Sequence, residues 1–202
     1  MKVIVIGTGT IGSAVRHSLV GHGHEVVSVG RRSGDVHADI TDMSSLRELF
    51  ATVGRFDAVA NAAGDVFPDA LPNTTDDQWT RSIAAKGMGQ INVVRAALPH
   101  IAETGSFTLI SGILGDAFTF ASSIGATVNR MVEGFVVAAA TELPRGLRIN
   151  CVSPTVLAES TDYHQFFPGF TPVAAVDVAL AYVRAISNPI TGQTLKLHKT
   201  DN

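Results

Sequence analysis

Three glycines at a fixed spacing give the clearest chemical signal in the sequence. Gly7, Gly9 and Gly12 form the pattern G-x-G-x-x-G directly after the apolar run 3–6. The first glycine of this pattern permits a sharp turn, the second lets the backbone approach a pyrophosphate, and the third allows close packing of helix on strand. The free N–H groups at the start of the following helix attract phosphate. The pattern predicts a dinucleotide site, and a purely structural tight turn is the alternative. The predicted contacts from this turn are Gly7, Thr8, Gly9, Thr10, Ile11 and Gly12.

A second group with chemical potential follows the predicted strand Glu25 to Val29. After Gly30 the chain continues with Arg31, Arg32 and Ser33. Dinucleotide folds that bind the ribose 2′-hydroxyl place an acidic residue at this strand end, and here the charge is opposite. Two guanidinium groups and a hydroxyl favour a 2′-phosphate, so NADP(H) is predicted in preference to NAD. A solvated basic turn is the alternative.

Alternating strand and helix patterns are expected to position these groups. Strands are predicted at 3–6, 25–29, 36–40, 56–61, 107–110, 147–152 and 193–198. Helices are predicted after the glycine turn and at 43–52, 75–98, 122–142 and 173–186. This alternation predicts one α/β domain over residues 1–202, a doubly wound parallel sheet (Rossmann fold) of about seven strands with helices on both faces.

Three details of these elements bear on the site. Gly87 and Gly89 interrupt the long helix 75–98, which predicts close packing against the sheet or another helix. Asp39, near the end of the third strand, either accepts a hydrogen bond from an adenine amine or serves as a turn and cap residue. The segment 153–172 has few helix or strand cues and carries several aromatic residues, which suits a mobile substrate lid.

The composition narrows the class of protein. The chain has 202 residues, 46% of them hydrophobic and 16% charged, with a formal net charge of −3. These values describe an ordinary globular domain and give no basic surface for nucleic acid. The first strand leaves no room for a signal peptide, no apolar run is long enough to span a bilayer, and the single cysteine, Cys151, fits a reducing compartment. We therefore expect a cytoplasmic protein that binds neither membrane nor nucleic acid.

Several segments resemble the short-chain dehydrogenase/reductase family over almost the whole chain. Asn61 to Gly64 (NAAG) is similar to the family's N-A-G segment, and Leu109 to Gly112 (LISG) to its catalytic-serine strand. Residues 142–154 (ELPRGLRINCVSP) resemble its E-x-x-x-x-G-I-R-V-N-x-V-x-P block, and 190–193 its I-T-G-Q segment. The glycine turn has the general dinucleotide spacing instead of the family's T-G-x-x-x-G-x-G. The further cofactor contacts implied are Ile40, Asn61, Ala62, Ala63, Gly64, Asn129, Pro154 and Val156.

The same resemblance exposes a missing active site. Family members use an Asn, Ser, Tyr and Lys set, with tyrosine and lysine spaced as Y-x-x-x-K. Alignment on 132–134 and on the ELPRG block puts Gly125 at the tyrosine and Asn129 at the lysine, while Ala84 takes the asparagine's place. Of the set only Ser111 remains, as a residue that hydrogen-bonds a substrate oxygen or as a serine that satisfies backbone groups.

Another group must then supply the proton that carbonyl reduction requires. Tyr163 and His164 are candidates because the lid folds over the nicotinamide in relatives, and packing is the alternative role for both. Arg130 adjoins the vacant lysine position but points about 100° away around the helix. His22 and His24 lack a third ligand, so we expect no metal.

The sequence leaves two hypotheses about function. One is an NADP(H)-dependent oxidoreductase of a small, apolar carbonyl-type substrate with a non-standard proton donor. The other is a catalytically silent NADP(H)-binding sensor or partner protein. The helical regions 79–98 and 122–142 resemble those that build oligomers in the family, so a homodimer or homotetramer is expected.

Overall fold

The computed structural model describes residues 1–198 and contains a seven-stranded, fully parallel sheet of order β3-β2-β1-β4-β5-β6-β7. The strands are β1 (Lys2–Ile6), β2 (Glu25–Gly30), β3 (Val36–His37), β4 (Phe56–Asn61), β5 (Ile101–Ile110), β6 (Arg148–Pro154) and β7 (Thr194–Leu197). The chain moves outward from β1 to β3 and then returns to the other side of β1 with β4. The carboxyl ends of β1 and β4 therefore form the switch point at which such sheets bind ligands.

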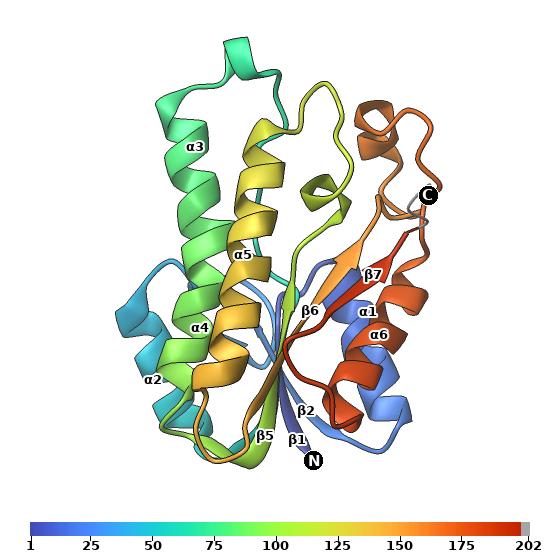
Figure 1. The fold of residues 1–202 in the computed structure, drawn as a ribbon. Helices are drawn as coiled ribbons and strands as arrows, with labels where there is room; N and C mark the ends of the chain where they lie inside the picture. Colours follow the sequence, from blue (N-terminus) through green and yellow to red (C-terminus); the bar gives the residue numbers. More distant parts are fainter. Residues whose placement is uncertain (199–202) are drawn as a thin grey trace.

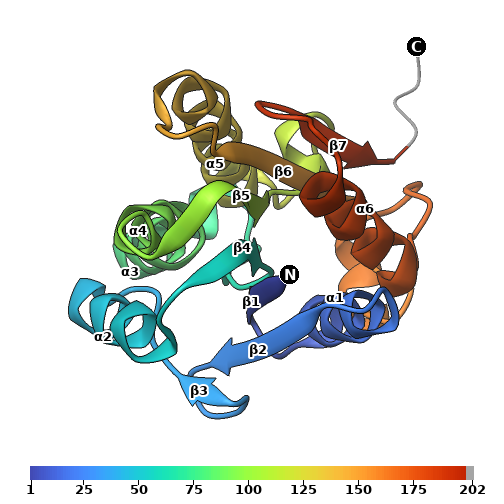
Figure 2. The ribbon, with the colours of Figure 1, turned by 90° about the horizontal axis from the view of Figure 1, so that it is seen from below.

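Helices cover both faces of the sheet (Figures 1 and 2). One face carries α1 (Thr10–Gly21) and α6 (Ala175–Ser187). The other carries α2 (Met43–Val53), α3 (Asp76–Ser82), α4 (Gly89–Ala97) and α5 (Ser123–Glu142). Val3 and Val5 pack into the first layer, whereas Ile4 and Ile6 pack into the second. This two-sided burial explains the unbroken apolar run of β1, and the predicted doubly wound fold is confirmed.

The predicted helix 75–98 contains a π-helical segment. Thr75 caps α3 in a capping box with Gln78, and residues Ile83–Met88 (η2) then join α3 to α4. A Cβ on Gly87 would lie 2.5 Å from the Met131 sulfur on α5. A Cβ on Gly89 would lie 2.9 Å from Ile40. The prediction that these glycines mark close packing is confirmed.

Two strands differ from the predicted bounds. β3 stops at His37 because the side chain of Asp39 accepts hydrogen bonds from the backbone N–H and hydroxyl of Thr41, which turns the chain. β5 begins at Ile101 instead of Phe107, and its pairing with β4 shifts register between Phe56 and Ala58. The sequence around Thr104, whose φ is +60°, gives no strand signal, so the first residues of β5 are not predicted.

The segment between β6 and α6 has little regular structure, as predicted. It contains the short 3-10 helix η4 (Thr161–Phe166), and a bridge between Leu157 and Val173 closes its base. The rings of Phe166 and Phe120 lie 6.2 Å apart, so the segment contacts the loop after β5. Movement of this segment as a lid stays a prediction. Within residues 1–198, no helix combines the length and the apolar character needed to cross a membrane.

Candidate functional site

A pocket of about 290 Å³ opens at the carboxyl ends of β1, β2 and β4. Its walls come from the glycine turn, the end of β2, residues 38–41 and the loop 62–65. Nine predicted cofactor residues line it: Gly7, Thr8, Gly9, Arg31, Asp39, Ile40, Ala62, Ala63 and Gly64. Thr10, Ile11, Gly12, Arg32, Ser33, Asn61, Asn129, Pro154 and Val156 do not. Ile6, Gly30, Ala38, Thr41, Asp65 and Ala85 also line the pocket, and sequence reasoning missed them.

The glycine turn has the geometry that a pyrophosphate needs. Gly7 has φ +107°, and a Cβ on Gly12 would lie only 1.8 Å from the Gly7 carbonyl oxygen, so helix and turn touch backbone to backbone. A Cβ on Gly9, in contrast, would meet nothing within 4 Å. Gly9 caps α1 without a side-chain hydrogen bond, and the first turn carries no acidic residue. The N–H groups and positive dipole end of α1 therefore face open space beside the pocket.

Charged side chains stand at the rim of the pocket. The Arg31 guanidinium lies 3.2 Å from the Asp65 carboxylate, and both side chains are about two-thirds exposed (68% and 69%). An ion pair this exposed contributes about 0–1 kcal/mol, so a ligand phosphate can displace it. Ser33 is tied to Thr8 by a 2.7 Å hydroxyl contact, which joins the basic turn to the glycine turn.

Asp39 acts as a turn residue and also lies at the cofactor pocket. Its carboxylate makes the turn through Thr41, with the hydrogen bond to the hydroxyl as the larger cause of a lowered pKa. The same residue lines the pocket. Its contact with adenine stays a prediction.

The loop after β4 is held from inside the domain. The buried Asn61 donates from Nδ2 to the Ala63 carbonyl oxygen at 3.0 Å. The phenol of Tyr182 on α6 donates to the Asn61 carbonyl oxygen at 2.7 Å. Tyr182 is fully buried, and desolvation raises its pKa well above the ordinary value. Tyr182 therefore fixes the shape of the pocket and is not available as an acid.

The positions of the family's tyrosine and lysine carry other contacts. A Cβ on Gly125 would lie 2.9 Å from Leu114 Cδ1 and 3.8 Å from Val66 Cγ1, so apolar side chains occupy the approach to this position. Asn129, one helical turn later, is 5% exposed and donates from Nδ2 to the Gly112 carbonyl oxygen at 3.1 Å.

Ser111 makes its side-chain contact inside the protein, and its role towards a substrate stays a prediction. Its hydroxyl is buried and donates to Glu133 Oε1 at 2.8 Å, beneath the surface of α5. The next residue, Gly112, faces Asn129, because a Cβ on Gly112 would lie 3.2 Å from Asn129 Nδ2. Ser111 and Gly112 follow the last residue of β5, and both contact α5, where Asn129 and Glu133 lie one helical turn apart.

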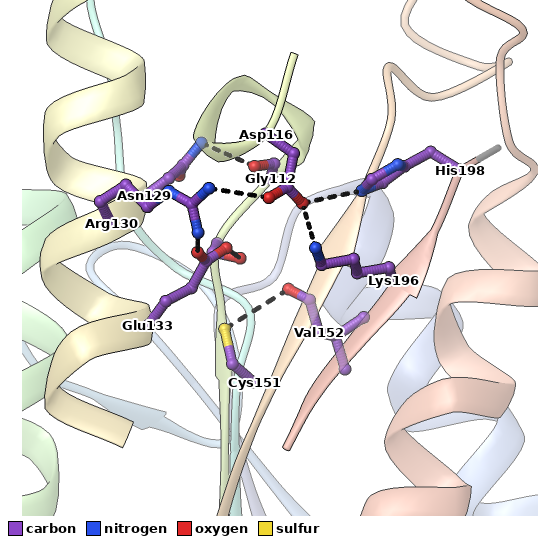
Figure 3. Close-up of polar contacts among 10 residues, drawn as sticks. Gly112, Asp116, Asn129, Arg130, Glu133, Cys151, Val152, Lys196 and His198 are labelled. Carbon is purple, nitrogen blue, oxygen red and sulfur yellow. Dashed lines mark hydrogen bonds and ion pairs between the residues drawn. The ribbon is translucent and has the colours of Figure 1, made fainter. Parts of the chain in front are cut away.

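Glu133, which accepts the hydrogen bond from Ser111, is part of a charged network (Figure 3). Arg130 contacts Glu133 at 3.0 Å and Asp116 at 2.8 Å, and Lys196 on β7 contacts Asp116 at 2.8 Å. Arg130 is thus engaged with two carboxylates, and its unsuitability as a replacement for the family's lysine stays a prediction. The network connects α5, the loop after β5 and the edge strand.

Tyr163 and His164 both lie in η4. The Tyr163 side chain is half-exposed (51%), and its ring is 6.5 Å from that of Phe166. His164 donates from Nε2 to the Leu157 carbonyl oxygen at 2.8 Å, because a carbonyl can only accept. These contacts hold the segment to itself, and the role of either residue as an acid stays a prediction.

Sequence reasoning missed Lys86. This lysine of η2 is 8% exposed, and its Nζ donates to the Ser111 carbonyl oxygen at 3.2 Å. Desolvation lowers its pKa to about 8, partly opposed by Cys151 and Asp65. Buried charged side chains are rare. The burial of Lys86 follows from the fold, so the local pattern A-A-K-G does not predict it. The signal available was its position two residues after Ala84, the vacated asparagine position.

Two other features contribute nothing to this centre. A larger groove of about 1050 Å³ lies between α6 and β7 and contains none of the predicted site residues. Within residues 1–198, no three His, Cys, Asp or Glu side chains are grouped so that they could hold a metal ion.

Fold and pocket together define a dinucleotide-binding Rossmann domain. A family model described as Enoyl-(Acyl carrier protein) reductase matches residues 11–190. The chain therefore belongs to the short-chain dehydrogenase/reductase family, a family of oxidoreductases. One of its structural neighbours was solved with a nicotinamide cofactor.

Relatives support the same assignment. The protein lin1944 from Listeria innocua is 39% identical, with a TM-score of 0.95 over 98% of this chain and 100% of that chain. A small-chain dehydrogenase solved in complex with NADPH is 25% identical, with a TM-score of 0.87 over 98% of this chain and 96% of that one. The (-)-trans-carveol dehydrogenase of Rhodococcus erythropolis is 27% identical over 82% of this chain and 65% of its own length. The chain spans 40 to 65% of the length of four curated relatives it matches.

Proposed function

We propose that the protein is an NADP(H)-dependent oxidoreductase of a small, apolar carbonyl-type substrate. The observation that carries this proposal is the open space at Gly9, beside a pocket whose opposite rim holds Arg31. The turn would hold the pyrophosphate with the N–H groups of α1. Arg31, with Arg32 and Ser33, would meet the 2′-phosphate through charge-assisted hydrogen bonds.

When bound, NADPH supplies the hydride for the new C–H bond of the product. The chain's own residues bind and orient. Tyr182 and Asn61 fix the loop 62–65 against the pocket, and Asn129 fixes the end of β5 through Gly112. An apolar substrate is supported by Leu114 and Val66 beside Gly125, and by the contact of the 153–172 segment with Phe120.

A silent NADP(H)-binding protein is the second candidate. It is favoured by the loss of tyrosine and lysine at Gly125 and Asn129, and by the engagement of Ser111 with Glu133. Loss of a general acid typically reduces a rate by about 10²- to 10⁴-fold, but hydride transfer depends on orientation and can continue. This asymmetry favours the oxidoreductase.

Binding and turnover separate these candidates. NADPH and NADH affinities are measured by fluorescence for the wild type, Arg31→Ala and the control Arg47→Ala on the exposed side of α2. Arg31→Ala is expected to weaken NADPH binding by about 10- to 100-fold, since a hydrogen bond to a charged group contributes about 1.5–3 kcal/mol, and to leave NADH unchanged. Equal NADH and NADPH affinities in the wild type would contradict the NADP preference.

Turnover is then measured as NADPH oxidation with a panel of apolar ketones, aldehydes and quinones. Steady oxidation supports the oxidoreductase, whereas tight NADPH binding without oxidation supports the silent protein. We also propose a cytoplasmic homodimer or homotetramer that associates through α3, α4 and α5. Sedimentation tests the assembly, and a monomer at micromolar concentration would contradict it.

A further inference from the structure

Lys86 reaches the end of β5 from a position next to the cofactor pocket. A Cβ on Gly64, whose φ is +147°, would lie 2.8 Å from Lys86 Cδ and 3.2 Å from its Cα. The aliphatic stem of Lys86 thus passes directly against the glycine of the loop 62–65. Gly64 and Ala85 both line the pocket, so the stem lies directly behind its wall.

The ammonium group is only partly satisfied. Its hydrogen bond to the Ser111 carbonyl oxygen uses one of three N–H donors. Gln90, the other buried polar residue of this stretch, is fully engaged with the Lys86 carbonyl and with both backbone groups of Ile110. A buried ammonium with unused donors costs free energy unless a ligand meets them.

Two donors from neighbouring helical segments contact consecutive carbonyl groups at the end of β5. Lys86 from η2 contacts the carbonyl of Ser111, and Asn129 from α5 contacts that of Gly112. Asn129 stands where family members carry the lysine. The positive charge that family members carry on α5 is here present at the neighbouring carbonyl, contributed by the adjacent segment η2.

We propose that Lys86 is the proton donor of the reaction, in place of the phenol absent at Gly125. The inference rests on the proposed oxidoreductase function. The hydride forms the C–H bond at the carbonyl carbon, the C=O π pair moves to oxygen, and an N–H of Lys86 gives its proton to that oxygen. Lys86 is left as a neutral amine and regains a proton from water, so the substrate gains two electrons and two protons overall.

Local surroundings suit this role. A proton donor works best when its pKa is near the working pH, and burial brings the pKa of Lys86 to about 8. Desolvation by burial is the largest cause of the lowered pKa of Lys86, and the Asp65 carboxylate after β4 opposes it. Cys151 is itself neutral, because desolvation raises its pKa to about 12. Lys86 also lies within a π-helical segment, a feature frequent at functional sites.

The test compares Lys86→Met with Lys2→Met. Lys2 likewise donates to one backbone carbonyl, that of Val53 at 2.9 Å, but at the opposite end of the sheet. Lys86→Met is expected to lose about 10²- to 10⁴-fold in kcat/KM. Its NADPH affinity is expected to stay within about threefold of the wild type, and the limb near pH 8 in the kcat/KM profile to disappear. Lys86→Arg keeps the charge but cannot release a proton, so it should be equally impaired. An active Lys86→Arg would overturn proton donation.

A second readout does not depend on turnover. The sequence has four lysines, so protein labelled with 13C at lysine Cε gives few signals, and Lys86→Met assigns the one of interest. This signal is expected to titrate near pH 8 and to shift when NADP⁺ is added. Titration above pH 10, or no response to NADP⁺, would overturn the inference. Normal turnover in Lys86→Met refutes the role of Lys86 alone, whereas NADPH binding without turnover in the wild type refutes the proposed function and the proton transfer with it.

Discussion

The hydroxyl of Ser111 donates to Glu133 at 2.8 Å, inside the protein. Glu133 is 6% exposed, and its second oxygen accepts from Arg130. The serine therefore satisfies a buried carboxylate, and its proton is committed to that bond. We therefore predict a structural role for Ser111, in the network that joins α5 to the loop after β5.

Replacing Ser111 by alanine should lower stability more than cofactor binding. The change leaves Glu133 Oε1 buried without its donor, which costs about 1–3 kcal/mol. We expect a lower urea midpoint for Ser111→Ala and an NADPH affinity within about threefold of the wild type. Ser44→Ala, at an exposed position of α2, is the control and should change neither value. Wild-type stability together with lost turnover would instead assign Ser111 to the substrate.

The second and third glycines of the pattern, Gly9 and Gly12, should separate folding from binding. A Cβ on Gly12 would collide with the Gly7 carbonyl oxygen at 1.8 Å, so Gly12→Ala must move backbone and should destabilise the domain by about 1–3 kcal/mol or more. Gly9→Ala meets nothing within 4 Å and should fold normally. Its methyl group would occupy the place of the pyrophosphate, and we expect NADPH affinity to fall at least about tenfold. Thermal melting and NADPH titration check the pair, and unchanged binding in Gly9→Ala would contradict this position for the phosphates.

The contrast between Gly12 and Ser111 shows what the sequence could predict. The glycine turn is local: strand, turn and helix follow one another, so spacing alone fixed the geometry. Ser111 lies just beyond the end of β5, and its contact with Glu133 on α5 depends on how that helix packs against the sheet. Lys86 and Asn129 come from helical segments far apart in sequence, and they contact consecutive carbonyl groups at the end of β5. No local sequence pattern predicts that these two side chains bind neighbouring carbonyl groups.

Stability should depend on pH through Lys86. Its pKa is about 8 in the folded protein, against about 10.4 for an unperturbed lysine. Between these values the unfolded state binds more protons than the folded state, so stability rises with pH across this window. Below about pH 8 the charge is buried in full, and Lys86→Met should be the more stable protein by up to about 3 kcal/mol. Urea unfolding at pH 7 and pH 10 should show this advantage shrinking, whereas Lys2→Met shows no such change. An advantage that stays constant would mean that the pKa of Lys86 is unperturbed.

Restoring the family's tyrosine and lysine should not restore an ordinary active site. A side chain at Gly125 meets Leu114 and Val66, and a lysine at 129 loses the hydrogen bond to Gly112 and brings a second ammonium towards Lys86. We expect Gly125→Tyr/Asn129→Lys to be destabilised by about 1–3 kcal/mol through overpacking, and to turn over no faster than the wild type.

Gly134→Ala on the same helix calibrates this result. A Cβ there meets nothing within 4 Å, so the helix should gain up to about 1 kcal/mol. Adding Leu114→Ala to the double variant should recover part of its lost stability, because it empties the space that the phenol needs. Melting temperatures and NADPH oxidation rates are measured for all four proteins. A double variant with wild-type stability and a faster rate would mean that the centre still accepts the family's acid, and that Lys86 is not its replacement.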